Sequence, residues 1–534
     1  MRTNVTDIIE KFDHSDERIN SPRTLEYYFG RGKYTIIIGL LLQCMIFNQC
    51  GNMFYMAFSG LSPTLKSCGL ANLSTMDQKE ICGKSEIIKK EYNCTFDIDG
   101  DFYSMNMEFQ KFCEDKIEIK KCISSEMVGV VIGSLVGGKL SDYFGRRKIM
   151  LIAIIFSSMS SFFVSFARNL DDVFYGRGFL GLFNGCTMVI VIVYVIENIQ
   201  KSDRVWMFNV ITWAPNIAIF TGVAYLSHDW RDLARKLGIL TIPAILFCFY
   251  VPESPKWLIQ QGRLNDAKKV IKKIAKINGI RYDMPDILEA INMEFNISKL
   301  QSRNGSKKYS FYHLFYTKDF VSYIMTLSFI AFTSSTCNYG ILFNMDKMSG
   351  TIYQNMLITA ALRYPLNILI AICDIKISNI GRKAVMLTFI LLITACSTSI
   401  AIILSLGKGS IMGTFIRVMQ LLIITFTSQL YTVGSICSSE LFPTPIRNMA
   451  YAVNQLSSRL GNTIAPYFFY LSYFDEMIPY CVISSLTLIA AGAFLFFIPE
   501  TKGHPLNEIM PMKKDSIFRK KSIKEDGVTM IDNN

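Results

Sequence analysis

The chain has 534 residues, of which 51% are hydrophobic and only 18% are charged. A soluble chain of this length could not bury so much apolar surface at a mean hydropathy of +0.29, so lipid is its expected solvent and soluble multidomain classes are excluded. The net charge of +12 does not indicate nucleic-acid binding, because Lys and Arg gather between or after apolar runs, at 139–148, 256–308 and 513–524. No basic face with interleaved aromatic residues is present.

Residues 1–33 are polar and contain no short apolar core, so we expect a cytoplasmic tail without a cleavable signal peptide. Residues 34–54 form an apolar run long enough to cross the roughly 30 Å hydrocarbon core of a bilayer. A polar stretch within 57–124 follows, which we expect to be a large extracellular loop. Five further apolar runs complete six crossings, near 125–141, 149–168, 174–196, 206–226 and 234–251.

A charged segment at 252–318 interrupts this pattern and predicts a cytoplasmic central loop. Six more apolar runs follow, near 320–343, 353–374, 384–405, 411–436, 448–472 and 478–498. We therefore predict an N-terminal bundle over 34–251, a C-terminal bundle over 319–500 and a basic cytoplasmic tail over 501–534. An even number of crossings places both termini on one face, which the Lys and Arg asymmetry marks as cytoplasmic.

The apolar runs are expected to be helices, because backbone amides within a bilayer must be paired inside the protein. Three prolines lie inside these runs, and we expect them to mark kinks: Pro215, Pro365 and Pro466.

The cysteines and two glycosylation sequons support this topology. Six of the fourteen cysteines fall in or beside the first loop: Cys50, Cys68, Cys82, Cys94, Cys113 and Cys122. An even set in one loop indicates disulfide bonds formed in an oxidising compartment, and six cysteines allow fifteen pairings, none of which the sequence selects. The same loop carries N-glycosylation sequons at Asn72 and Asn93, which favour an extracellular position.

The short loop after the second predicted helix reads GKLSDYFGRRK over residues 138–148. Gly138 permits close helix approach, Gly145 permits a tight turn, and Asp142 can cap a helix or pair with nearby cations. The loop after the eighth predicted helix, SNIGRK over 378–383, keeps Gly-Arg-Lys but has serine in place of the aspartate. This spacing resembles the signature loop of the major facilitator superfamily, and a weakened second copy is typical of two related six-helix halves.

Three further motifs narrow the resemblance. VPESPKWL at 251–258, followed by Gly-Arg and an amphipathic Lys-rich helix, comes after the sixth helix; ELFPTPIRN at 440–448 follows the tenth, and PETKGHPL at 499–506 follows the twelfth. Sugar porters share variants of all three but lack a long, glycosylated, cysteine-rich first loop. With that loop, the chain resembles the organic cation, anion and carnitine transporters of solute carrier family 22, from about residue 25 to 510.

This resemblance implies an all-α membrane protein of the major facilitator fold. It implies twelve transmembrane helices in two six-helix bundles, with a disulfide-rich first extracellular loop and a helical cytoplasmic central loop. It also implies alternating access, in which the bundles rock about a central site. Charged motif residues then look like gating partners whose ion pairs hold one state closed: Asp142, Arg146, Arg147, Arg177, Glu197, Glu440 and Arg447. The alternative is that these charges are static and set the topology.

Two ionisable residues stand well inside predicted membrane helices, Arg363 in the eighth and Arg459 in the eleventh. Charges there cost about 2.5–3.5 kcal/mol on insertion scales and are usually functional. A guanidinium is the natural partner of a carboxylate. Cation-transporting members of the resembled family carry acidic residues at these two places, so the resemblance indicates an anionic or zwitterionic substrate. For Arg363, which departs from every branch of that family, the structural alternative is pairing with backbone carbonyls or a helix C-terminus.

Aromatic residues should form the rest of a mostly apolar pocket. Tyr339 is favoured, because Asn338-Tyr339-Gly340 stands where anion-transporting members of the family have a similar Tyr-Gly. The other candidates are Tyr194, Trp213, Phe220, Phe343 and Tyr467, for which helix packing or lipid contact is the alternative.

We therefore expect a multi-pass plasma-membrane transporter of small organic ions, acting as a facilitator or as an exchanger against a counter-transported anion. An organic anion or a zwitterion such as carnitine is favoured. An inside-negative potential opposes anion uptake by about 2.3 kcal/mol per charge at 100 mV, and no mid-membrane acid stands out as a coupling site. The alternatives are an organic cation transporter that uses cation–π contacts and a non-transporting receptor or adaptor on the same fold. Four scattered histidines, with no metal-ligand spacing and no nucleotide loop, argue against an enzyme, and no cofactor or metal is expected.

Overall fold

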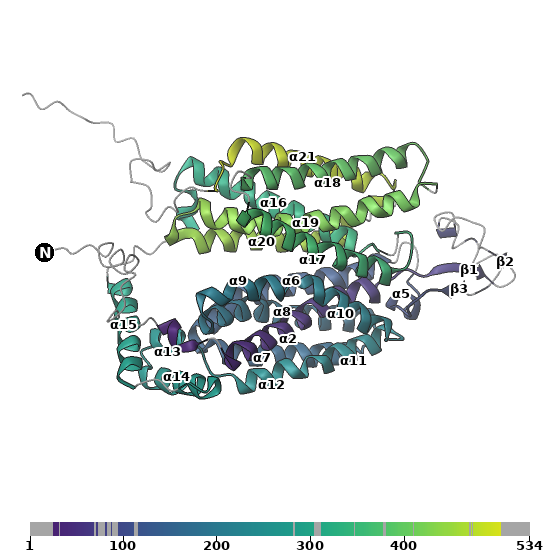
Figure 1. The fold of residues 1–534 in the computed structure, drawn as a ribbon. Helices are drawn as coiled ribbons and strands as arrows, with labels where there is room; N and C mark the ends of the chain where they lie inside the picture. The colour runs from purple at the N-terminus through teal and green to yellow at the C-terminus, as the bar shows by residue number, and fades with distance from the viewer. Residues whose placement is uncertain are drawn as a thin grey trace, which may run out of the picture.

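Two helical bundles lie side by side in the computed structural model (Figure 1). The structure describes residues 25–30, 32–68, 71–72, 81–82, 87, 94, 96–111, 116–280, 284–303, 311–345, 348–376, 381–409, 411–468, 471–472 and 474–502. A small β-sheet lies at one end of the bundles. Three helices lie at the other end: α13 (Pro255–Gln260), α14 (Leu264–Asn278) and α15 (Met284–Arg303). We name these the sheet end and the α14 end.

The N-terminal bundle is built from six crossings. In chain order they are α2 (Lys33–Ser59), α6 (Lys116–Phe144), α7 (Arg146–Val164), α8 (Leu170–Asn198), α9 (Lys201–Val210) continued by α10 (Trp213–Tyr225), and α11 (Trp230–Leu240) continued by α12 (Ile242–Tyr250). Pro215 lies in the first turn of α10, just after the break between α9 and α10, because proline has no amide hydrogen to continue a preceding helix. Helices α6 and α8 approach closely: a Cβ on Gly133 would stand 1.8 Å from the Leu182 carbonyl oxygen.

The C-terminal bundle repeats this arrangement. Its crossings are α16 (Lys318–Leu342), α17 (Ile352–Lys376), α18 (Arg382–Ser405), α19 (Gly413–Leu441), α20 (Thr444–Phe468) and α21 (Ile478–Phe497). Pro365 and Pro466 lie inside α17 and α20.

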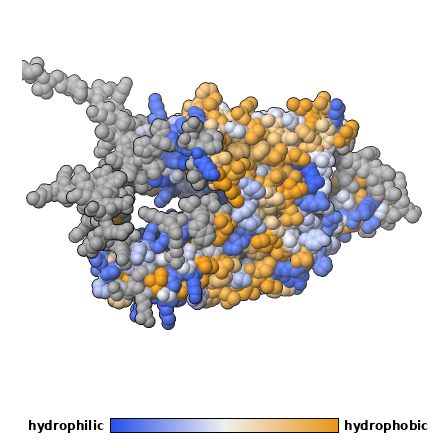
Figure 2. All heavy atoms as spheres, viewed as in Figure 1, coloured by the Kyte–Doolittle hydropathy of each residue, from blue (hydrophilic) through white to orange (hydrophobic). Residues whose placement is uncertain are grey.

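Three of the crossings differ from the others in length or composition. Within the described residues, nine helices are long and apolar enough to span a membrane; α6 and α20 are not among them, and α10, with 13 residues, is too short by itself. Helix α6 packs against α20, and α10 packs against α17, so these helices form the contact between the bundles. Their polar residues are therefore shielded from lipid, while orange apolar atoms cover the outer face of both bundles (Figure 2).

The first loop folds at the sheet end into three antiparallel strands in the order β2-β1-β3. The strands are β1 (Thr64–Cys68), β2 (Ala71–Asn72) and β3 (Phe96–Asp99). A disulfide joins Cys68 to Cys94, and Cys82 is also disulfide-bonded. The expectation of disulfides for Cys50 and Cys122 is wrong: both are free thiols buried in the interiors of α2 and α6, where helix packing keeps them from the loop.

Several loop predictions remain untested. Cys113 and the sequon residue Asn93 lie outside the described residues. Asn72 belongs to β2, where its backbone pairs with Ser67. A one-turn helix, α5 (Met105–Glu108), then ties the loop to the bundle, since the Glu108 carboxylate accepts hydrogen bonds from Trp230 Nε1 at 2.7 Å and from Arg231.

The charged segment at the α14 end and the end of the N-terminal tail fold into helices that pack together. The 3-10 helix η1 (Leu25–Phe29), within the predicted polar tail, buries Leu25, Tyr28 and Phe29 against α14 and α15. The Glu26 carboxylate forms ion pairs with Arg204 Nη2 (2.9 Å) and Lys256 Nζ (2.6 Å). A second 3-10 helix, η3 (Phe311–Phe315), leads into α16.

Candidate functional site

Arg459 lies on the face of α20 that meets the N-terminal bundle. Its guanidinium reaches across to α8, where Nη2 stands 2.7 Å from the Met188 sulfur. The side chain is half-buried, and within the described part of the chain it has no carboxylate partner. A thioether is a weak acceptor, so the charge of Arg459 is left uncompensated between the bundles.

Arg363 is more deeply buried, with 7% of its surface exposed. Its Nη2 donates to the Ile424 carbonyl oxygen of α19 at 2.8 Å, Nε donates to the same oxygen at 3.3 Å, and Nη2 also donates to the Asn338 amide oxygen of α16. The guanidinium therefore ties α17 to α16 and α19. The bonds to the Ile424 carbonyl oxygen are of the kind that the structural alternative predicted. Through the bond to its amide oxygen, Arg363 also holds Asn338, and with it the neighbouring Tyr339, in place.

A fully buried ion pair lies nearby in the N-terminal bundle. Arg177 of α8 contacts Glu126 of α6 at 2.5 Å, and neither side chain is exposed to solvent. Arg177 also donates to the Asn52 carbonyl oxygen at 2.6 Å, and its guanidinium carbon stands 4.5 Å from the centre of the Tyr55 ring. The sequence offered no signal for Glu126, because its partner lies 51 residues away along the chain.

The grouping of Arg177 with the cytoplasmic motif residues is wrong. Arg177 follows the sheet-end start of α8 by seven residues, whereas Glu197 is next to the last residue of the same helix. At 1.5 Å per residue the two are about 30 Å apart along the helix. The pair with Glu126 makes Arg177 a buried structural cation of the N-terminal bundle.

The middle of the membrane thus holds a net positive charge. Glu126 neutralises Arg177, while no ion pair within the described residues includes Arg363 or Arg459. Asn338, which accepts from Arg363, directly precedes Tyr339, and the hydroxyl of Tyr431 of α19 donates to Ser335, which bonds to Ser458 beside Arg459 in the chain. Two uncompensated cations in a low-dielectric region favour a negatively charged ligand between them.

Tyr339 and Tyr431 are the aromatic residues best placed beside the two arginines. Tyr339 belongs to α16, and its hydroxyl stands 3.9 Å from the Met53 sulfur of α2, across the bundle contact. The Tyr431 hydroxyl donates to Ser335 at 2.9 Å. Tyr431 also lines a cavity of about 40 Å³ with Ser458, which is large enough for water. No sequence feature distinguished Tyr431 from the many other aromatic residues.

The other aromatic candidates take different positions. Tyr194 is fully buried near the α14 end, where its hydroxyl donates to the Pro252 carbonyl oxygen at 2.6 Å, so its expected place in a central pocket is wrong. Phe220 is also fully buried and packs against Phe54 and Phe58 inside its own bundle. Three candidates remain near the contact: Phe343 packs 5.6 Å from Tyr339 between ring centres, and Trp213 and Tyr467 are partly exposed.

The bundles meet mainly at the sheet end. Tyr353 of α17 packs against Phe58 of α2 (5.3 Å between ring centres) and Tyr225 of α10 (5.5 Å). Lys120 Nζ donates to Asn344 at 3.0 Å. Among the residues that the structure describes, the hydrogen bonds between bundles lie from mid-membrane to this end. At the α14 end Figure 2 shows a hollow between the bundles. This conformation is closed at the sheet end and open at the α14 end.

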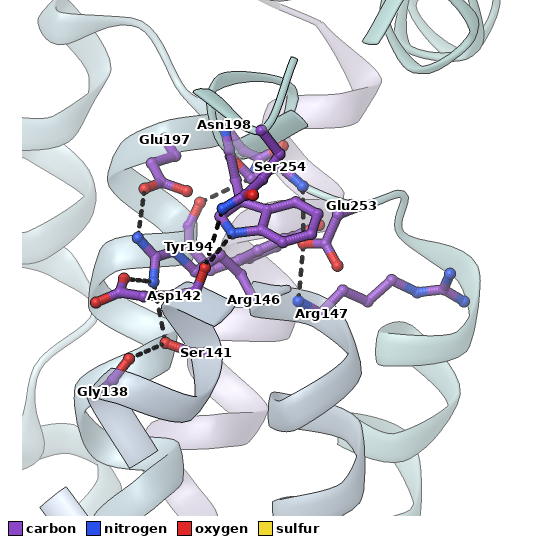
Figure 3. A network of polar contacts seen from close by, with 12 residues as sticks. Gly138, Ser141, Asp142, Arg146, Arg147, Tyr194, Glu197, Asn198, Glu253 and Ser254 are labelled. Atoms are coloured by element: carbon purple, nitrogen blue, oxygen red, sulfur yellow. Dashed lines mark hydrogen bonds and ion pairs between the residues drawn. The ribbon is translucent and has the colours of Figure 1, made fainter. Parts of the chain in front are cut away.

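A cluster of polar residues links the helix ends of the N-terminal bundle at the α14 end (Figure 3). Arg146, at the start of α7, donates to Asp142 of α6, to Ser141 at 3.0 Å and to Glu197 of α8 at 3.3 Å. It joins the ends of three helices. The predicted gating residues Asp142, Arg146 and Glu197 are therefore brought together, within one bundle.

The neighbouring residue Arg147 contacts a different carboxylate, that of Glu253 in the PESP motif. The Glu253 carboxylate accepts from the Arg147 backbone amide at 2.9 Å, which places a negative charge at the N-terminus of α7. The Arg147 side chain donates to the carbonyl oxygens of Cys248 (2.9 Å) and Phe249 (2.8 Å) at the end of α12. Gly145 has φ of 110°, and a Cβ there would stand 2.6 Å from the Glu253 carboxylate, so only glycine fits.

The C-terminal bundle carries an equivalent cluster. Glu500 of the PETK motif accepts from the backbone amides of Arg382 (2.9 Å) and Lys383 (3.2 Å) at the start of α18, and Lys383 Nζ donates to the Leu495 carbonyl oxygen at 2.8 Å. Arg382 forms an ion pair with Glu440 of α19, as Arg146 does with Glu197. The internal repeat predicted from the two Gly-Arg motifs is thus visible as two matched carboxylate caps.

The remaining motif residues, Arg447 and Ser378, form no carboxylate pair that the structure describes. Arg447 donates to the Phe442 carbonyl oxygen at 3.3 Å and has no carboxylate partner within the described chain. Ser378, which replaces the aspartate in the second motif, lies outside the described residues.

Known proteins are similar to this chain in sequence. A family profile described as "Sugar (and other) transporter" matches residues 52–512. Organic cation/carnitine transporter 2 of Rattus norvegicus is 30% identical over 438 residues, which cover 78% of this chain and 72% of the rat protein. The chain belongs to solute carrier family 22 of the major facilitator superfamily. Mus musculus solute carrier family 22 member 4 is 29% identical, with 77% of this chain and 72% of that protein covered.

Solved structures agree on the fold of this family 22 chain. The xylose transporter XylE from E. coli, in an inward-open conformation, superposes with a TM-score of 0.59 over 88% of this chain and 97% of that chain, at 17% identity. The major facilitator fold, with twelve membrane-spanning segments in two six-helix bundles, is therefore confirmed. As a member of solute carrier family 22, the protein is a membrane transporter.

Proposed function

We propose that this family 22 transporter carries small organic anions or zwitterions across the plasma membrane by alternating access. The observation that carries the proposal is Arg459: a half-buried guanidinium between the bundles with no carboxylate partner in the described chain. A bound carboxylate would supply the missing countercharge, and its two oxygens match the planar fork of the guanidinium.

The surroundings of Arg459 support the same class of substrate. Arg363 adds a second charge without a carboxylate partner in the described chain, and two tyrosines lie close along the same contacts. Tyr339 follows the Asn338 that Arg363 holds, and the Tyr431 hydroxyl donates to Ser335, which bonds to Ser458 next to Arg459. A zwitterion such as carnitine would place its carboxylate on Arg459 and its quaternary ammonium against the aromatic rings. The printed names of several relatives, organic cation/carnitine transporter 2 among them, include this substrate.

The conformation supports alternating access with the α14 end facing the cytoplasm. In this orientation Asn72, in strand β2, and the Cys68–Cys94 disulfide lie on the oxidising exterior. We infer that in the opposite state the sheet end opens and the two Gly-Arg clusters approach each other. Asp142, whose side chain is 66% exposed, is the group of the first cluster most free to meet the C-terminal bundle.

The test is uptake of labelled carnitine, a dicarboxylate and tetraethylammonium into cells that express the chain, with the membrane potential held at two values. A zwitterion feels no net field, whereas each negative charge is opposed by about 2.3 kcal/mol per 100 mV. Carnitine uptake should therefore not change with potential. Uptake of the dicarboxylate should rise when the cells are preloaded with an exchangeable anion.

Substitution of Arg459 separates its role from that of the fold. Arg459→Ala should weaken apparent affinity for the carboxylate substrate by about 30-fold, equivalent to about 2 kcal/mol for a lost charged partner, with normal surface expression. Arg459→Lys should recover part of it. Arg235→Ala, at an exposed arginine of α11, is the matched control and should leave uptake unchanged. Wild-type affinity in Arg459→Ala would show that the arginine is structural.

The alternative substrate class is an organic cation. The names of the same relatives favour it, and Tyr339 and Tyr431 could supply cation–π contacts. Tetraethylammonium uptake that rises as the cell interior becomes more negative, with no carnitine or dicarboxylate uptake, would establish this alternative and reject the role of Arg459.

A further inference from the structure

Helix α14 carries an uninterrupted lysine face that transport does not explain. Its buried side consists of Ala267, Ile271, Ile274 and Ala275, which pack against the N-terminal bundle and η1. The opposite side carries five lysines in nine positions: Lys268, Lys269, Lys272, Lys273 and Lys276. At 3.6 residues per turn these five lie on one arc of about 140°, which holds no other residue within 268–276; Asn265, one turn earlier, also falls on it. We refer to this arc as the lysine face.

The lysine face has few countercharges of its own. Asp266 is shared by Arg263 at 2.7 Å and by Lys269 at 3.4 Å, and Lys269 is 80% exposed. No ion pair within the described residues includes Lys272 or Lys276, and both are exposed. A row of like charges raises the energy of the protein unless an external anion compensates it, so the face is suited to a polyanionic partner.

One edge of the lysine face lies next to the exposed apolar residues at the end of α12. Lys273 Nζ donates to the carbonyl oxygen of Tyr250, the last residue of α12, at 2.9 Å, and stands 5.4 Å from the centre of its ring. Tyr250 is 51% exposed, and the preceding α12 residues Leu246 and Phe249 are 63% and 55% exposed. Exposed apolar residues that end in a tyrosine are typical of a helix leaving lipid at the headgroup level. Figure 1 shows α14 beside the end of α12, at the side of the bundle.

We propose that the lysine face binds anionic phospholipid headgroups of the leaflet at the α14 end. The lysine face begins where the exposed apolar residues of α12 end, at the contact of Lys273 with Tyr250, and lipid phosphates would lie at this boundary. Lysine-rich amphipathic helices at such a boundary attract anionic lipid. The identification of that leaflet as cytoplasmic rests on the proposed function. A soluble acidic protein or a nucleic acid is a less suitable partner, because the hydrocarbon that must cover the exposed apolar residues at the end of α12 limits access to the adjacent side of the lysine face.

Lipid binding would stabilise more than α14 itself. The last residue of the helix, Asn278, accepts from the Tyr34 backbone amide at 2.9 Å and donates to the Phe29 carbonyl oxygen at 2.8 Å. It therefore joins α14 to the start of α2 and to η1. Headgroups held on the lysine face fix this junction to the membrane surface while the bundles move.

The test compares three full-length variants with the wild type in neutral detergent. The first is K269Q/K272Q/K276Q, the second is the charge-preserving K269R/K272R/K276R, and the third is K148Q/K318Q/K376Q, which removes three exposed lysines elsewhere at the α14 end. Each protein is titrated with short-chain phosphatidylserine, phosphatidylinositol 4,5-bisphosphate or phosphatidylcholine, and binding is followed by the rise in unfolding temperature.

Wild type should be stabilised by the two anionic lipids and not by phosphatidylcholine. The glutamine variant of the lysine face should bind the bisphosphate lipid at least about tenfold more weakly, while the arginine variant and the control variant should stay within about twofold of wild type. Equal binding by the glutamine variant, an equal loss in the control variant, or equal stabilisation by phosphatidylcholine would each overturn the proposal. Equal binding of soluble inositol 1,4,5-trisphosphate would also overturn it, in favour of a soluble anion.

The readout does not depend on transport. If carnitine and dicarboxylate uptake fail while the lipid effect holds, the proposed substrate class is wrong and the lysine face stands. If uptake is normal and the glutamine variant binds lipid like wild type, only the lipid proposal is wrong.

Discussion

The buried pair of Glu126 and Arg177 offers a sharp test of how the N-terminal bundle is held together. Both side chains have no exposed surface, and Glu126 is the only carboxylate bound to Arg177 within the described residues. The Nε and Nη1 atoms of Arg177 have no hydrogen-bond partner there, so the charge depends on Glu126, the Asn52 carbonyl oxygen and the Tyr55 ring.

We expect Glu126→Gln to lower the free energy of unfolding by about 3–5 kcal/mol, because it leaves a buried guanidinium that cannot lose its proton. Arg177→Gln should cost less, since a lone buried carboxylate can become neutral by binding a proton. The double variant Glu126→Gln/Arg177→Gln should recover most of the loss, because both charges are removed and the two amides can bond to each other.

Unfolding midpoints of the four proteins in one detergent form a double-mutant cycle. Glu118→Gln on the same helix is the control: its pair with Lys111 at 2.8 Å is partly exposed, and such pairs contribute about 0–1 kcal/mol. If Glu126→Gln is as stable as this control, or if the double variant is less stable than either single variant, Glu126 does not stabilise the bundle by compensating the charge of Arg177.

Two further predictions concern the loop and the helix packing. Burial acts to raise the pKa of Glu108, but hydrogen bonds and charge attraction from Arg231 outweigh it and hold the pKa below its usual 4.5. Stability from a depressed carboxyl pKa is complete above about pH 4.5 and is lost as pH falls below it. The protection of loop amides against hydrogen exchange, expressed relative to the intrinsic exchange rate at each pH, should therefore fall at about pH 3. With Glu108→Gln this protection should already be low at neutral pH. Gly133→Ala should prevent close packing of α6 and α8, because the new methyl group would stand 1.8 Å from the Leu182 carbonyl oxygen. Gly222→Ala is the control, because its methyl group would meet nothing within 4 Å. The thermal unfolding midpoints of the two variants should differ by several degrees, and equal midpoints would show that α6 and α8 do not need glycine at 133.

Sequence alone determined the solvent, the fold and the family of this protein. An apolar run of membrane length predicts a membrane-spanning helix, because the free energy of transfer into lipid depends on the composition of the run and not on its contacts with other helices. The Gly-Arg motifs were also informative, because a turn with a glycine at positive φ, as at Gly145, is a local requirement. Even the repeat between the halves was visible in these motifs.

Tertiary structure alone decided which charges are compensated. Arg363 and Arg177 are both arginines inside membrane helices, yet one bonds to a carbonyl and an amide from two other helices, and the other meets Glu126. Only Arg459 is left facing the other bundle without a carboxylate in the described chain. Pairing of this kind depends on which faces of distant helices meet. Spacing along one chain segment does not contain that information, whereas the apolar runs that define the crossings do not require it.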